Sequence, residues 1–198
     1  STSMGLIRAF KTEATQLNDR YAFNMLGTTV VQGTVTGSTS TVNRVYNYFG
    51  TGDITHLQRR NASINNRIYG VQDPDFPSAG LTSSNLTVSS TSFTNVNTNT
   101  CSVNNSWYAD VWAKTGTTAA DDNQKIIGRA AIYNKNVYFT AYKPGLSCGT
   151  GTSTLIEYTA SCIATLMGAP ASGLATAPVI DNKGNIYVGL SNVPVKSG

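Results

Sequence analysis

Residues 126–142 read Ile-Ile-Gly-Arg-Ala-Ala-Ile-Tyr-Asn-Lys-Asn-Val-Tyr-Phe-Thr-Ala-Tyr, and the fold class can be inferred from them. Two runs of β-branched and aromatic residues flank the turn at 134–136, which indicates an antiparallel hairpin because asparagine tolerates a positive φ. The unit recurs at 176–180 and 186–190, around the turn Asp-Asn-Lys-Gly-Asn. Recurrent hairpins with an aromatic residue on the outgoing strand are typical of propeller blades. We expect a mainly β chain of antiparallel hairpins forming part of a β-propeller, with a β-sandwich as the alternative.

Further strands are expected on both sides of this hairpin. They are predicted by runs of β-branched and aromatic residues that end at Gly, Asn or Pro. Upstream of it they cover residues 29–32, 34–36, 44–49, 66–71 and 106–112. Residues 78–105 are nearly a low-complexity tract of Ser, Thr and Asn. We interpret this tract as an ordered but irregular excursion with one or two edge strands, anchored by sparse apolar residues. These anchors are Leu86, Val88, Phe93 and Val96.

Residues 5–24 form the one stretch with helical periodicity. Apolar residues recur there at steps of three and four, which predicts one apolar face of a short amphipathic helix. They are Leu6, Ile7, Phe10, Ala14, Leu17 and Tyr21. The chain therefore divides into an N-terminal helix with its lead-in, residues 1–27, and a β-rich domain, residues 28–198.

The composition is typical of secreted all-β proteins. Thr, Ser and Asn account for 65 of the 198 residues, whereas charged residues are only 12%. The formal charge of +4 is scattered along the chain, and the absence of a basic stripe argues against nucleic-acid binding. No run of 18 apolar residues that could span a bilayer occurs, and Ser1–Gly5 lacks the features of a signal peptide. We expect an extracellular protein, present as a mature form or as an excised piece.

Cys148 and Cys162 are the two cysteines suited to pairing. They enclose 13 residues that read as a turn, a strand and another turn. A disulfide closing a loop of that size stabilises by about 3 kcal/mol in the chain-entropy estimate. We predict this disulfide; two buried thiols are the alternative. Cys101 is left over, either free or paired outside this chain.

Residues for catalysis and metal binding are scarce. His56 is the sole histidine, and no Gly-x-Ser-x-Gly motif accompanies it. Glu13 and Glu157 are the only glutamates, so a facing carboxylate pair is not indicated. Asp73 and Asp75 enclose a proline and lack the further ligands of a calcium loop. We expect no catalytic residue, no metal site and no cofactor.

Four stretches resemble the β-propeller domain of the type IV pilus tip-associated adhesins, the PilY/PilC family. Their order along the chain carries the resemblance, which spans about residues 45–190. They are Val45–Asp53 with its Phe-Gly-Thr-Gly; Asn66–Asp73; Trp107-Tyr108 followed by Gly128-Arg129, Val137–Thr140, Pro144, Cys148, Gly151 and Leu155; and Gly173–Ile180. Members of the family are much longer, so the chain would be an incomplete propeller or a reduced relative. The calcium loop expected of the family is absent.

The resemblance implies a non-catalytic extracellular protein that contacts other pilus subunits or the rest of a longer chain. It also implies attachment to a surface or a host receptor, and a role in pilus biogenesis. The expected contact surfaces are residues 81–105 and the aromatic residues Trp107, Tyr108 and Trp112, although both tryptophans fit a core equally well. The alternative is a filament subunit, a pilin-like globular part, in which residues 5–24 are the lower half of a helical spine.

Overall fold

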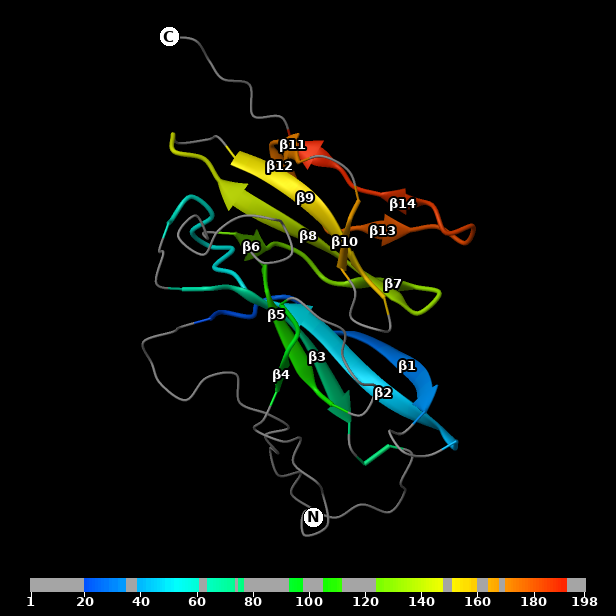
Figure 1. Ribbon diagram of the computed structural model, residues 1–198. Helices are drawn as coiled ribbons and strands as arrows, with labels where there is room; N and C mark the ends of the chain where they lie inside the picture. The colour runs from blue at the N-terminus through cyan, green and yellow to red at the C-terminus, as the bar shows by residue number, and fades with distance from the viewer. Residues whose placement is uncertain are drawn as a thin grey trace, which may run out of the picture.

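The computed structural model describes the segments that carry nearly all of the predicted strands. These segments are residues 20–34, 39–60, 64–73, 75–76, 93–97, 105–111, 124–147, 151–159, 164–167 and 170–191. Their elements are short strands, β1 to β15, and no helix occurs among them (Figure 1). Within these segments no helix therefore exists that could cross a membrane.

The first sheet is an antiparallel meander with one added edge strand. Its strand order is β1-β2-β3-β5-β4, and only the β4–β5 pair is parallel. The strands are β1 (Gly27–Thr34), β2 (Thr41–Gly50), β3 (Arg67–Asp73), β4 (Thr94–Asn95) and β5 (Trp107–Asp110). The edge strand β4 confirms, in the described residues 93–97, the expectation of an edge strand in the Ser/Thr/Asn-rich excursion.

The second sheet is built around the long hairpin of β8 and β9. Its order is β10-β9-β8-β6, with β7 also paired to β8 and β11 also paired to β9, and all of these pairs are antiparallel. The strands are β6 (Lys125–Ile126), β7 (Ala131–Tyr133), β8 (Asn136–Pro144), β9 (Gly151–Tyr158), β10 (Ala164–Leu166) and β11 (Ala171–Ser172).

Four two-residue strands complete the described chain and are called the C-terminal layer below. They form two antiparallel pairs, β12 with β15 and β13 with β14. The strands are β12 (Leu174–Ala175), β13 (Val179–Ile180), β14 (Ile186–Tyr187) and β15 (Leu190–Ser191).

The first two sheets pack face to face around an aromatic core (Figure 1). Trp107 of the first sheet stacks on Tyr158 of the second with ring centroids 5.3 Å apart, and Phe139 meets Tyr158 edge to face. Each such side chain contributes about 1.5–3 kcal/mol relative to its exposed state. Because the core draws on both sheets, neither sheet can bury its apolar face alone.

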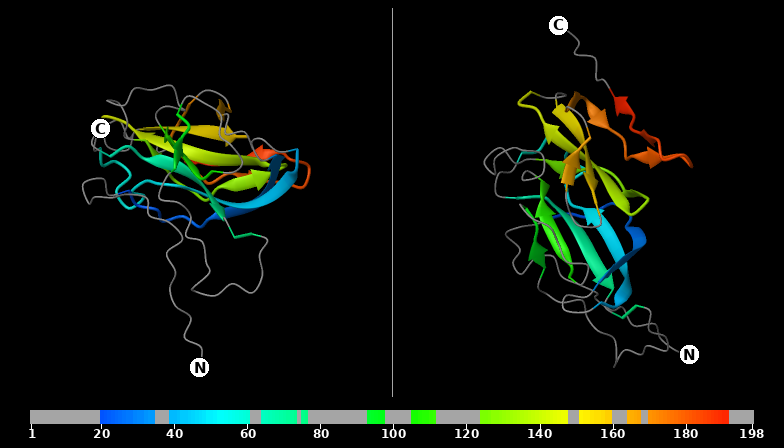
Figure 2. Two further views of the ribbon diagram at one scale, coloured as in Figure 1. Left: turned by 60° about the horizontal axis from the view of Figure 1, so that its bottom comes forward. Right: turned by 45° about the vertical axis from the view of Figure 1, so that its right-hand side comes forward.

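The second sheet is covered on both faces. Residues Val137–Tyr142 of β8 are buried at every position, although successive side chains of a strand point to opposite faces. One face meets the first sheet, and β12 and β13 of the C-terminal layer pack against β8, β9 and β7 on the other. Figure 2 shows the layers following one another in chain order, from the blue and cyan first sheet to the orange and red C-terminal layer. The chain is thus mainly β, with antiparallel sheets stacked as successive layers.

Both predicted hairpin turns are confirmed. Asn134 and Lys135 have φ values of 47° and 69°, the positive values that a two-residue turn matching the strand twist requires. In the second turn Gly184 has a φ of 87°, and the Asp181 carboxylate accepts hydrogen bonds from the amides of Lys183 and Asn185. Each turn is therefore set by residues within the turn itself.

Two sequence-based expectations need correction. The strand expected over 126–133 is interrupted between β6 and β7, and Gly128 within this interruption lies where a Cβ would be 2.6 Å from the Cβ of Ala177. The helix expected over 5–24 is not present in its described part, since residues 20–24 are non-helical and three of them hydrogen bond to residues far away in the sequence instead. The rest of that helix, residues 1–19, lies outside the described residues.

Candidate functional site

The Phe-Gly-Thr-Gly stretch forms the joint between the first and second sheets. A Cβ on Gly50 would lie 2.3 Å from the Cβ of Ile126 in β6, so only glycine allows this approach. The next residue, Thr51, is fully buried, and its carbonyl accepts a hydrogen bond of 3.0 Å from the Ile126 amide. Its own amide donates to the Arg67 carbonyl at 2.8 Å, while its hydroxyl accepts from the Arg67 amide at 2.8 Å. One threonine thus links β2, β3 and β6.

A second joint of the same kind connects the second sheet to the C-terminal layer. Thr176 donates its amide to the Gly189 carbonyl at 2.8 Å and accepts the Gly189 amide on its hydroxyl at 3.0 Å. Its carbonyl receives the hydroxyl of Thr140 in β8 at 3.0 Å. The two joints therefore repeat one arrangement, in which both the amide and the hydroxyl of a threonine pair with a single residue.

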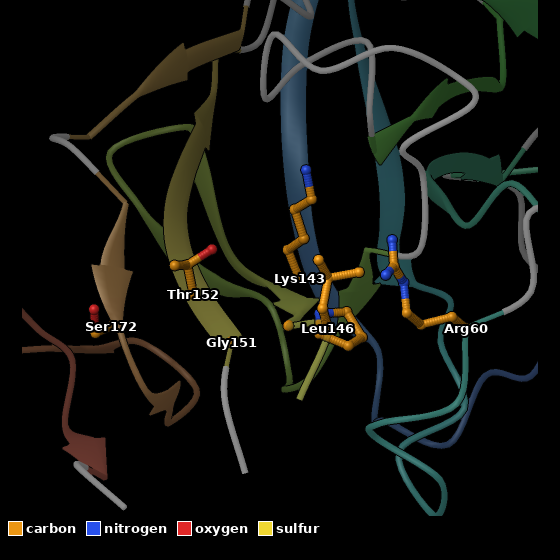
Figure 3. Close-up of a pocket in the computed structure, with 8 residues that line it drawn as sticks. Arg60, Lys143, Leu146, Gly151, Thr152 and Ser172 are labelled. Carbon is orange, nitrogen blue, oxygen red and sulfur yellow. The ribbon is translucent and has the colours of Figure 1, made fainter. Parts of the chain in front are cut away.

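An open groove of about 580 Å³ lies at the ends of β8 and β9 (Figure 3). We call it the Arg60–Lys143 groove. The described residues that line it are Arg60, Lys143, Pro144, Gly145, Leu146, Gly151, Thr152 and Ser172. Cations, hydroxyls and apolar carbons are thus all present, and no acidic side chain is among these lining residues.

The strand register aligns one cation and two hydroxyls across this groove. Lys143 of β8 is paired with Thr152 of β9, and Thr152 is paired with Ser172 of β11. Directly paired residues of antiparallel strands project to the same face of a sheet. The three side chains therefore form a row perpendicular to the strands, which Figure 3 shows together with Arg60.

Arg60 reaches the groove from the loop after β2, and a buried lysine holds that loop in place. Lys125 is only 5% exposed, and its ammonium donates to the carbonyls of His56, Leu57 and Arg59 at 2.9, 2.6 and 2.7 Å. Burial lowers the pKa of Lys125 from its ordinary value. Three carbonyls around one ammonium restrict the backbone immediately before Arg60, so the arginine is held beside β8.

Close packing against Gly151, one of the lining residues, restricts the same loop further. The Gln58 amide donates to the Tyr142 hydroxyl at 2.7 Å, and Tyr142 is buried. A Cβ on Gly151 would lie 2.3 Å from that hydroxyl oxygen, so glycine is required on the opposing strand. The first residues of β9 therefore lie directly against the aromatic residue that anchors the loop.

The aromatic residues predicted as an interface have different environments. Trp107 is 2% exposed and belongs to the core, which is one of the two environments that the sequence left open for it. Tyr108 is half-buried on the other face of the first sheet, where the Arg67 guanidinium covers its ring at 3.9 Å. Arg67 also forms an ion pair of 2.7 Å with Asp110. Trp112 and residues 98–104 of the predicted contact surface lie outside the described residues, as do residues 81–92.

All three cysteines, and with them the predicted Cys148–Cys162 disulfide, also lie outside the described residues. Sequence reasoning missed the Arg60–Lys143 groove, because its residues come from four separate segments of the chain. The only local signal was the Arg59-Arg60 doublet. Among the residues that the structure describes, no group of three His, Cys, Asp or Glu side chains could hold a metal ion.

His56, Asp53 and Thr55 lie together but do not form a catalytic relay. The Asp53 carboxylate and the Thr55 hydroxyl both contact the same ring nitrogen of His56, Nδ1, at 2.9 and 3.0 Å. A nucleophile–base–acid relay needs both ring nitrogens. The His56 side chain is 65% exposed, and the carboxylate also accepts the Thr55 and His56 amides. The cluster is an Asp-capped turn that begins the loop carrying Arg60.

We expect this turn to lose stability in acid. Hydrogen bonding, chiefly from the Thr55 hydroxyl, lowers the pKa of Asp53 to about 2. A carboxyl whose folded-state pKa is depressed stabilises the fold above its unfolded pKa of 3.8 and loses that contribution as the pH falls towards about 2. Urea unfolding of wild type and Asp53→Asn between about pH 4 and about pH 2 measures this contribution. The stability difference between the two should shrink as the pH falls; a difference independent of pH would contradict the prediction.

Comparison with known proteins returns no relative. No family model matches the chain, and neither a curated protein nor a solved structure is significantly similar to it. Function is therefore inferred from the residues and their geometry.

Proposed function

We propose that this chain is a non-catalytic extracellular component of a type IV pilus, a tip-associated adhesin or assembly factor that mediates surface attachment and pilus biogenesis. We also propose that its stacked layers are successive blades of a β-propeller. Its partners would be other pilus subunits or the remainder of a longer chain, and a surface or host receptor.

The repeated threonine joint is the observation that carries this proposal. Thr51 lies in the Phe-Gly-Thr-Gly stretch and Thr176 in the Gly173–Ile180 stretch, two of the stretches on which the family resemblance rests. In each, the amide and hydroxyl of the threonine pair with one residue of its own layer, Arg67 or Gly189, and its carbonyl accepts a hydrogen bond from the second sheet, from Ile126 or Thr140. The motifs shared with the adhesin family therefore coincide with contacts between layers, as expected for a repeated blade. Agreement between the motifs and these contacts favours the family resemblance over chance.

The stacking order supports the propeller over the β-sandwich. A sandwich has two sheets whose outer faces meet solvent, whereas β8 is buried on both of its faces. Adjacent blades of a propeller, in contrast, pack face to face in chain order. The C-terminal layer fits a further blade, and its outward side chains Val179 and Tyr187 are 64% and 57% exposed.

Immunogold electron microscopy of filaments sheared from the source cells tests the function. Antibodies raised against this chain should label one filament end, because a tip protein is present only there. Filaments from cells lacking the chain are the control and should carry no gold. Label along the whole shaft would overturn the tip assignment in favour of a filament subunit, and absence of label from filaments would overturn a pilus role.

A further inference from the structure

We propose that the Arg60–Lys143 groove binds an acidic peptide segment of a partner protein. In this arrangement ligand carboxylates meet the two cations, and an aliphatic ligand side chain covers Leu146. The inference rests on the proposed function, since a pilus component acts through contacts with other subunits. It adds the place of one contact and the chemistry of the segment that occupies it.

The charges of the groove select an anion. None of the described carboxylates forms an ion pair with Arg60 or Lys143. No lining residue is acidic, and the chain as a whole carries a formal charge of +4. Two cations on one rim that no described carboxylate neutralises attract carboxylates and disfavour cationic ligands. The ligand therefore needs more than one negative charge along its length.

The polar row beside the cations suits a peptide backbone. The hydroxyls of Thr152 and Ser172 can both donate and accept hydrogen bonds, and they continue the line that starts at Lys143. An extended segment crossing the strands along this row could pair its amides and carbonyls with the hydroxyls. Its carboxylates could then reach Lys143 and Arg60 at the far end.

The apolar surface of the groove favours a peptide over a sugar or a nucleic acid. Leu146 is 92% exposed, and it lines the groove together with Pro144, the last residue of β8. An aliphatic ligand side chain would remove this leucine from water. Sugars and bases are commonly held by stacking on aromatic rings, and no aromatic side chain is among the described lining residues. Aliphatic residues between acidic ones match the surface best.

Preorganisation distinguishes this groove from a chance pair of surface cations. The loop before Arg60 is held by the three hydrogen bonds of Lys125, and Lys143 extends from the central strand of the second sheet. A rigid site loses less conformational entropy on binding than a pair of flexible side chains does. The fold thus sets the backbone positions from which both cations extend before a ligand arrives.

Fluorescence polarisation with the full chain and labelled peptides tests the proposal. The probe is Glu-Leu-Glu-Leu-Glu, and the matched control is Gln-Leu-Gln-Leu-Gln. Tighter binding of the acidic peptide is expected, and raising NaCl from about 50 to about 300 mM should weaken it because salt screens exposed charges. Equal binding of both peptides, or binding of neither, would overturn the proposal. Competition by sialyllactose or single-stranded DNA but not by unlabelled acidic peptide would also overturn it.

Variants assign the binding to the groove. Arg60→Gln and Lys143→Gln should each lower the affinity for the acidic peptide about twofold to fivefold, and the double variant should lower it about tenfold. Lys183→Gln, a matched loss of charge in the exposed turn between β13 and β14, should bind as wild type does. Circular dichroism melting of every variant checks the fold. If the folded double variant binds the acidic peptide with wild-type affinity, the groove is not the binding site.

The two proposals fail separately. Gold at filament tips without peptide binding would support the pilus role and overturn the proposed peptide site in the groove. If peptide binding depends on Arg60 and Lys143 but the protein is absent from filaments, the peptide site in the groove is supported and the pilus role is overturned.

Discussion

Replacing Trp107 with alanine is expected to lower the free energy of unfolding by about 3–5 kcal/mol. The indole is 2% exposed between the two sheets, stacked on Tyr158 and tilted against Tyr48. Its removal leaves a cavity that backbones on both sides prevent from closing. Urea unfolding followed by circular dichroism measures the effect, since tryptophan fluorescence would change with the mutation itself.

Two controls accompany this measurement. Leu146→Ala removes a side chain that is 92% exposed and should change stability by less than about 0.5 kcal/mol. Gly70 is paired with Trp107, and a Cβ there would lie 2.4 Å from the indole. Gly70→Ala should therefore lower the free energy of unfolding strongly in wild type and much less in the Trp107→Ala variant. This non-additivity measures the direct contact between the two residues. Strict additivity would contradict this packing.

Replacing Lys125 with methionine is expected to destabilise the protein by about 2–3 kcal/mol. The substitution keeps the length and apolar character of the side chain, but it leaves the carbonyls of His56, Leu57 and Arg59 without the ammonium. Hydrogen bonds to a charged group are stronger than neutral ones. The stability lost should therefore exceed the stability lost when an ordinary surface lysine is replaced. Urea unfolding at neutral pH measures it.

Lys183→Met is the matched control, because Lys183 lies in an exposed turn and its side chain has no hydrogen bond or ion pair among the described contacts. Its stability should remain within about 0.5 kcal/mol of wild type. Lys125→Met should also weaken binding of the acidic peptide, because the loop no longer holds Arg60 beside β8. Equal stability of the two methionine variants would show that Lys125 does not hold the loop.

Local features were predictable from the sequence because local interactions decide them. Asn134 and Lys135 adopt the left-handed turn that the Asn-rich spacing indicated, and the β-rich composition of 44–49 and 137–142 marked β2 and β8. The strand expected at 126–133 was only partly correct: it is interrupted between β6 and β7, where Ala177 of a different layer approaches Gly128. No pattern within 126–133 reveals a neighbour about fifty residues away along the chain.

The candidate site could not be read from the sequence for the same reason. Lys143, Thr152 and Ser172 become a row only through the pairing of β8, β9 and β11. Arg60 joins them only because Lys125, distant in sequence, binds the carbonyls before it. Likewise, the composition of Trp107-Tyr108 fits an interface or a core, and only the packing of two sheets buries the tryptophan.

The sequence by itself thus determined most of the longer strands, both hairpin turns and the polar, weakly charged character of this chain, since these depend on neighbouring residues and on composition. Tertiary structure alone decided which glycines and threonines join the layers, which aromatic residues are buried, and where two cations meet. Those outcomes depend on contacts between segments far apart in the chain, and their geometry exists only once the sheets have packed.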